Sequence, residues 1–180
     1  LWLLMGITLG TLHLYQTKPF DFYQTLKKIA TSSYAIIIYL AVVTFMMYIP
    51  MIGNFFTGED FMWLRNTASS GHANEFFFYP GTRLYFFLMY SFFWLNPTAY
   101  HIVSLTLHII IVILIFLLAG KVLRSTASAV LASFSFVILS SYQESIFLIS
   151  SVGHQFSVLF VLLSLLLFIL ALRGLGTART

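Results

Sequence analysis

The chain has 180 residues, of which 60% are hydrophobic and only 8% are charged, and its mean hydropathy is +0.96. This composition excludes a water-soluble domain, and the absence of cysteine excludes disulfides, thiolate catalysis and cysteine-ligated metals. The formal net charge of +4 comes from basic residues scattered at the ends of apolar segments, so nucleic acid is not an expected partner.

Four apolar segments have the length and composition of bilayer-spanning helices, at about 33–49, 97–119, 125–142 and 155–172. Pro50 ends the first, and Asn96-Pro97 opens the second with a cap and a proline in the first turn. Residues 1–15 are apolar but short, which leaves open whether they form a further span. Because the chain begins at Leu1 and ends in a polar tail, we expect a single transmembrane domain that is a fragment of a longer protein.

The aromatic stretch between Thr82 and Leu95 decides the expected topology. As a helix it covers only about 20 Å, less than the roughly 30 Å hydrocarbon core, and Tyr, Phe and Trp favour the membrane interface. If it does not span, basic and acidic loop residues separate onto opposite sides. The two sets are Lys27, Lys28, Lys121, Arg124 and Arg173 against Glu59, Asp60, Glu75 and Glu144.

Basic loops favour the cytoplasmic side of a membrane. We therefore predict an all-α polytopic membrane bundle with an outer loop at 51–96 that holds interfacial helices. The expected location is a bacterial inner membrane or its equivalent, with the acidic loops outside.

Three carboxylates of the outer side are candidate site residues. Thr57 can cap a short interfacial helix that has Glu59 and Asp60 in its first turn, where acidic residues also favour the helix dipole without any function. The functional alternative is a general base or metal ligand beside a lipid-borne phosphate. Glu144 ends the third expected span between apolar residues, where it faces either water or a partner.

Histidines and one arginine are weaker candidates for substrate binding. His101 and His108 lie seven positions apart on one helix face, where helix–helix hydrogen bonding is the alternative to substrate binding. His154 follows Glu144 in the short outer loop and could bind an acceptor or a phosphate. Arg83 opens the interfacial stretch, where a guanidinium suits either a lipid phosphate or simple snorkelling to the headgroups.

Four stretches resemble the GT-C superfamily of polytopic glycosyltransferases, in particular its protein O-mannosyltransferase-like and tetratricopeptide-repeat transmembrane mannosyltransferase-like groups. The first is the acidic-pair loop GEDFMWLRN, and the second is FYPGTRLYFFLMYSFFWLNPTAYH, similar to the family's "YRPL…LNPxxYH" region. HIVSLTLHIIIVILIFLL is similar to its "YHxxNxxxH" span, and YQESIFLIS to its "HxVExVxWIS" segment. The resemblance covers about residues 35–172, which corresponds to the N-terminal part of a typical member.

The resemblance implies a helical membrane bundle that transfers a sugar, usually with inversion, from a polyprenyl-phosphate donor to a protein or glycan acceptor. It assigns the base or acceptor-orienting role to Asp60 or Glu59, the second acidic position to Glu144 and stabilisation of the departing phosphate to Arg83. A divalent cation is left open as a cofactor. Two departures are visible: 139–141 (Leu-Ser-Ser) replace the family's histidine-proline pair, and proline precedes arginine in PGTR.

Two other classes of function stay open. A non-catalytic membrane protein, such as a transporter, flippase or assembly subunit, is the main alternative, although transporters favour polar residues near mid-membrane and the carboxylates here lie at span ends. A membrane O-acyltransferase would use an embedded histidine, for which His101 or His108 is the candidate.

Overall fold

The computed structural model describes residues 32–69, 79–139 and 144–177, with the backbone alone at 144–145 and 173–177. The chain divides into two compact units, Leu1–Ile36 and Ile37–Thr180. Of the first unit only 32–36 is described, and it contains the beginning of helix α3 (Ser33–Tyr48). The apolar segment 1–15 lies outside the described residues, so whether it forms a span stays open.

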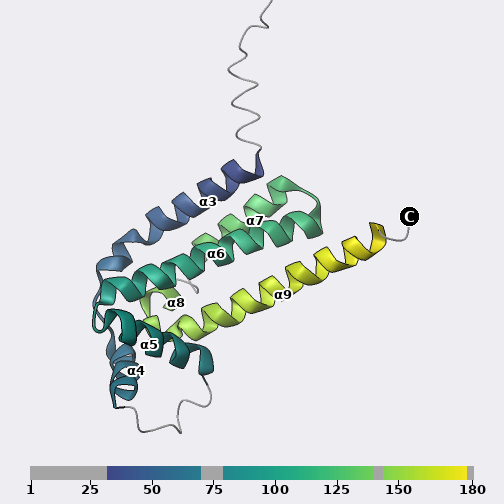
Figure 1. The fold of residues 1–180 in the computed structure, drawn as a ribbon. Helices are drawn as coiled ribbons and strands as arrows, with labels where there is room; N and C mark the ends of the chain where they lie inside the picture. Colours follow the sequence, from purple (N-terminus) through teal and green to yellow (C-terminus); the bar gives the residue numbers. More distant parts are fainter. Residues whose placement is uncertain (1–31, 70–78, 140–143, 178–180) are drawn as a thin grey trace, which may run out of the picture. The chain divides into compact units, whose positions relative to one another are not determined.

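Every element that the described residues form is a helix, which confirms the all-α prediction. After α3 the chain forms the 3-10 helix η1 (Ile49–Gly53), α4 (Gly58–Ala68), α5 (Pro80–Phe93), α6 (Pro97–Leu123), α7 (Thr126–Ile138), α8 (Glu144–Phe147), the 3-10 helix η4 (Ile149–Ser151) and α9 (Val152–Thr177) (Figure 1). Proline in the first turn of η1, α5 and α6 removes a backbone N–H that would have no helical partner.

Within the described ranges, three helical stretches are long and apolar enough to cross a membrane: Ser33–Gly53, Pro97–Leu123 and Ile149–Leu172. The last of these exposes most of its large side chains, including Phe160 and Phe168, as expected of a helix that faces lipid or further helices. Helix α7 has only 13 residues, about 20 Å, and residues 140–143 are not described. The expected span at 125–142 therefore stays a prediction.

Helix α6 packs against both α7 and α9 (Figure 1). A tight turn joins α6 to α7, with Arg124 in the left-handed conformation and the Ser125 Oγ accepting a hydrogen bond from the Ser128 N–H (3.3 Å). Helices α6 and α9 start at the same end of the unit, because Ser104 and Gln155, both near the starts of their helices, form a buried hydrogen bond (3.1 Å). The α6–α7 turn therefore lies at the opposite end.

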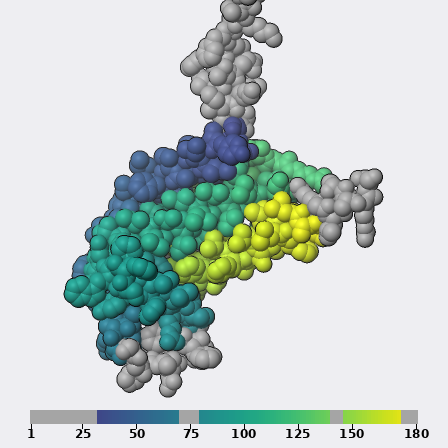
Figure 2. All heavy atoms as spheres, viewed as in Figure 1, coloured from purple at the N-terminus to yellow at the C-terminus, as the bar shows by residue number. Residues whose placement is uncertain are grey.

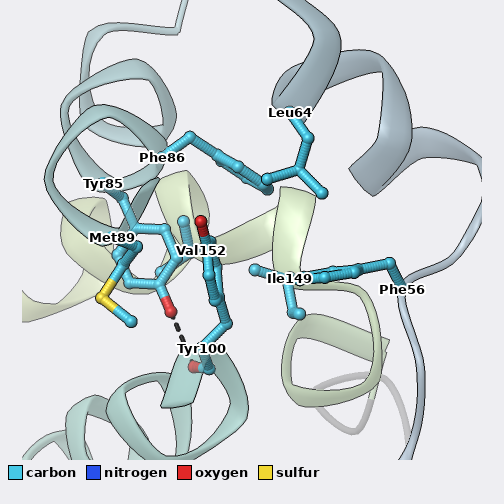
Figure 3. Packing of buried hydrophobic residues seen from close by; sticks show 8 residues of the cluster. All are labelled: Phe56, Leu64, Tyr85, Phe86, Met89, Tyr100, Ile149 and Val152. Carbon is cyan, nitrogen blue, oxygen red and sulfur yellow. Dashed lines mark hydrogen bonds between the residues drawn. The ribbon is translucent and has the colours of Figure 1, made fainter. Parts of the chain in front are cut away.

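A cluster of four aromatic and four other apolar side chains fills the end at which α6 and α9 begin, and we call it the aromatic core. Its buried members are Phe56, Leu64, Tyr85, Phe86, Met89, Tyr100, Ile149 and Val152 (Figure 3). They come from the loop before α4, from α4, α5 and α6, from η4 and from α9, so five helices and a loop share one core. The Tyr85 hydroxyl donates to the Tyr100 carbonyl oxygen (2.7 Å), the dashed line in Figure 3. This core is the platform beneath the candidate site.

Candidate functional site

The acidic pair predicted at 59–60 begins helix α4, and its two carboxylates have different surroundings. Thr57 is the N-cap, as the sequence indicated. Asp60 Oδ2 accepts hydrogen bonds from the Thr57 backbone N–H and hydroxyl, each at 2.9 Å. The Asp60 side chain is completely buried, whereas Glu59 is exposed. Asp60 therefore shapes the start of the helix, and Glu59 faces outward from the same turn.

The second oxygen of Asp60 makes a long-range contact. Its Oδ1 accepts the Ser150 backbone N–H at 2.7 Å, across 90 positions of the sequence. A buried carboxylate is costly unless its oxygens are hydrogen-bonded, and here both oxygens are. Asp60 thus holds the start of α4 against the segment that leads into α9.

Ser150 is the point at which three segments meet. Besides its bond to Asp60, its hydroxyl donates to Glu59 Oε2 (3.3 Å), and its carbonyl oxygen accepts the Thr82 hydroxyl (3.4 Å). Sequence reasoning did not select Ser150, although it closes the quoted motif YQESIFLIS. A serine in a mainly apolar segment carries no chemical signature of its own, and only the contacts across the fold give it a role.

Two of the predicted binding residues flank this meeting point. Arg83 directly follows Thr82 on α5, and His154 lies one helical turn beyond Ser150 on α9. Both side chains are exposed. Helices α4 and α5 both pack onto η4 or α9, so Glu59, Arg83 and His154 all belong to the end of the unit at which α9 begins.

Histidine 101 lies inside the protein rather than on this surface. Only 1% of its side chain is exposed, and neither ring nitrogen has a hydrogen-bond partner in the described part of the chain. The Asp60 carboxylate and the backbone of Asn54 and Ile146 lie in its neighbourhood. A substrate would reach this ring only after the surrounding segments move, so its predicted binding role stays a prediction.

Histidine 108 is also buried, and aromatic rings contact it on two sides. The Tyr48 ring meets it edge-on at 5.2 Å between centroids, and the Phe136 ring stacks on it at 5.3 Å. These contacts join residues of α3, α6 and α7. They favour a packing role over the embedded catalytic histidine of an acyltransferase.

Glu144 is the first residue of α8, a single helical turn that packs against α6. The description of this residue covers its backbone only, so its expected role as second acidic residue stays a prediction.

Within the aromatic core, burial determines the protonation state of the Tyr85 phenol. Tyr85 packs beside Tyr100 and close to Asp60, and its hydroxyl is satisfied by a backbone carbonyl. Burial, with smaller contributions from Tyr100 and Asp60, raises the pKa of Tyr85 far above its usual value of 10.0. The phenol is therefore a neutral hydrogen-bond donor and not a proton-transfer group.

The described residues contain no group of three or more His, Asp or Glu side chains that could hold a metal ion. Glu59 and Asp60 are adjacent, but both oxygens of Asp60 already accept hydrogen bonds from the protein. We therefore derive no chemical step through a metal.

Glu59, Arg83 and His154 are exposed and belong to the end of the unit at which α9 begins. Comparison with protein-family models, with curated proteins and with solved structures found no match to this chain.

Proposed function

We propose that this chain is the membrane-embedded part of a glycosyltransferase that moves a sugar from a polyprenyl-phosphate donor to a protein or glycan acceptor. The observation that carries the proposal is the exposed carboxylate of Glu59 at the end of an apolar helical unit, on a helix anchored by the buried Asp60. A carboxylate held at such an end could meet both a lipid-linked donor and an acceptor from the aqueous side.

In this proposal the two carboxylates have separate roles. Glu59 is the base, because its exposed carboxylate is open to an acceptor and accepts a hydrogen bond from the Ser150 hydroxyl. Asp60 is a positioning residue, because its buried oxygens are occupied by Thr57 and Ser150. The sequence offered either carboxylate as the base, whereas this proposal gives the two carboxylates different roles.

The reaction is a single displacement. The acceptor hydroxyl oxygen attacks the anomeric carbon while the bond from that carbon to the phosphate oxygen breaks, and Glu59 takes the hydroxyl proton. The lipid phosphate leaves with the electron pair of the broken bond and needs little acid assistance. Arg83 and His154 would stabilise its charge.

The orientation follows from the positive-inside rule. Lys121 and Arg124 lie at the α6–α7 turn, opposite the end that carries Glu59. We propose that this turn is cytoplasmic and that the Glu59 surface is on the outer or lumenal side.

The test compares Glu59→Gln with Asp60→Asn in membranes that contain the full-length protein, with labelled polyprenyl-phosphate sugar as donor. Loss of a general base typically lowers kcat by about 10²–10⁴-fold. We expect Glu59→Gln to show such a loss while the thermal unfolding temperature stays that of the wild type. We expect Asp60→Asn to lower the unfolding temperature, because a buried hydrogen-bonded carboxylate is replaced.

Arg65→Gln is the matched control, since Arg65 is an exposed charged residue of the same helix. It should leave both activity and stability unchanged. Full transfer activity in Glu59→Gln would contradict the proposed base. A wild-type protein that transfers no sugar would instead favour the non-catalytic class of membrane protein.

A further inference from the structure

We propose that Ser150 is a positioning residue whose hydroxyl orients the Glu59 carboxylate and whose backbone fixes that carboxylate relative to Arg83. This inference rests on the proposed function, because it gives the base of that reaction the partner that aligns it. Three hydrogen bonds that Ser150 makes to α4 and α5 carry the inference.

The main chain and the side chain of Ser150 bind different carboxylates of α4. The backbone N–H donates to Asp60 Oδ1 (2.7 Å), whereas the hydroxyl donates to Glu59 Oε2 (3.3 Å). The bond to Asp60 needs only a backbone N–H, which every residue except proline provides. The contact with Glu59 is therefore the part of this arrangement that requires serine at position 150.

The direction of the Ser150 hydroxyl is unusual for a serine of this protein. The hydroxyls of Ser91, Ser133 and Ser157 each donate to the carbonyl oxygen four positions earlier in their own helix. This local bond is common for helical serines and links no separate segments. The Ser150 hydroxyl instead reaches a carboxylate 91 positions away in the sequence.

An exposed glutamate needs such a contact to act as an efficient base. The Glu59 side chain is exposed, so packing does not hold its rotatable bonds in one conformation. A hydrogen bond to Oε2 restricts the carboxylate, and the second oxygen, Oε1, can then take the acceptor proton from a defined position.

The Ser150 carbonyl oxygen extends the arrangement to α5. It accepts the Thr82 hydroxyl (3.4 Å), and Thr82 directly precedes Arg83, which the proposed function places at the departing phosphate. In Figure 2 the teal atoms of α5 lie against the yellow-green start of α9, which follows Ser150 in the chain. A single displacement requires the base and the group that binds the phosphate to be held at a fixed separation. Ser150 links the two.

The test begins with three variants in membranes that contain the full-length protein, with labelled polyprenyl-phosphate sugar as donor. Ser150→Ala removes the hydroxyl and keeps the backbone groups, and Ser150→Thr restores a hydroxyl. Ser151→Ala is the matched control, because it makes the same change at the next residue of η4.

We expect Ser150→Ala to lower kcat about 10-fold with the acceptor KM unchanged, because alignment acts in the transition state. Its unfolding temperature should stay that of the wild type, since the bond to Asp60 remains. Ser150→Thr should recover part of the lost kcat, and Ser151→Ala should behave as the wild type.

A second readout does not depend on activity. The chain has three glutamates, Glu59, Glu75 and Glu144, and their carboxyl carbons can be labelled with ¹³C for NMR. The variant Glu59→Gln identifies the Glu59 signal by its loss. Because the shift of a carboxylate carbon responds to hydrogen bonding, this signal should move in Ser150→Ala, return toward its original position in Ser150→Thr and stay in place in Ser151→Ala.

Two results would overturn the inference and leave the proposed function intact, provided that Glu59→Gln loses activity. One is a Glu59 signal that does not move in Ser150→Ala, which would mean that the hydroxyl does not bind the carboxylate. The other is a kcat loss that comes with a lower unfolding temperature, or no loss at all. A wild-type protein without sugar transfer would instead reject the proposed function and with it this role of Ser150, and the NMR signal would still report the contact.

Discussion

At the scale of single residues, the fold separates groups that are chemically alike. Asp60 and Glu59 are adjacent carboxylates in one helical turn, yet the first is completely buried and the second is exposed. The reason is the helical rotation of about 100° between neighbours, which points Asp60 toward Ser150 and leaves Glu59 at the surface. One residue can therefore hold the local structure while its neighbour is available for chemistry.

Tyr85 provides a prediction about alkaline stability. Because burial raises the pKa of Tyr85 above 10.0, the unfolded chain releases this proton at a lower pH than the folded protein. The contribution of Tyr85 to the free energy of unfolding is fully present below pH 10 and is lost as the pH rises further. For a group of unfolded pKa near 10, the loss between pH 9 and pH 11 is about 1.4 kcal/mol.

Tyr85→Phe should remove this pH dependence, and it should cost about 1 kcal/mol at neutral pH through the lost bond to the Tyr100 carbonyl. Chemical unfolding in detergent micelles from pH 8 to pH 11 measures both effects. Equal alkaline slopes for the wild type and the variant would argue against the burial of the phenol.

At the scale of elements, the contact between α5 and α9 depends on a close approach at Gly153. A Cβ atom placed on Gly153 would overlap the Thr82 Oγ1. Gly153→Ala should therefore force Thr82 to rotate away from Ser150, and we expect a loss of about 1–3 kcal/mol in unfolding free energy. Thermal or chemical unfolding of the purified protein measures it.

Two further variants make this prediction specific. Gly153→Ala combined with Thr82→Ala should recover part of the loss, because the overlapping oxygen is gone. Gly81→Ala is the matched control: its added Cβ would meet Phe156 and Gly153 at ordinary distances of 3.5–3.7 Å. That variant should be neutral or slightly stabilising. If both glycines tolerate alanine equally, the close packing of α5 on α9 is contradicted.

At the scale of the whole molecule, the arrangement of charges predicts an orientation that labelling can measure. Arg65→Cys on α4 and Val122→Cys near the α6–α7 turn introduce single exposed thiols at opposite ends of the unit. In intact cells a membrane-impermeant maleimide should label position 65, whereas position 122 should react only after the membrane is opened. The unmodified chain, without cysteine, supplies the background. The reverse pattern would invert the proposed orientation.

Much of the helical architecture was predictable because its causes are local. Pro97 and the uninterrupted apolar run after it predict α6, and Thr57 followed by Glu59 and Asp60 predicts the start of α4. The extent of α7 was less predictable: the predicted apolar segment runs to 142, whereas α7 ends at Ile138 and Leu139 has an extended backbone.

The candidate site was predictable only in part. The acidic pair, Arg83 and His154 could be selected by residue type and position, but the burial of Asp60 and His101 could not. No local feature of the sequence pointed to Ser150, because its role comes from contacts with residues 68 to 91 positions away. Such pairings depend on how several helices pack, which no local window of sequence contains.

By itself, the sequence predicted an all-helical chain with four stretches that suit a membrane, three of which coincide with membrane-length helices of the described residues. It also showed that acidic and basic loop residues lie in different gaps between these stretches. These properties follow from hydrophobicity, spacing and caps within a few helical turns. The tertiary structure alone decided that Asp60 is buried, that Ser150 joins α4 to α5, and that α5 bridges the starts of α6 and α9. The physical reason is that side-chain burial and long-range hydrogen bonds form only when distant segments share the aromatic core.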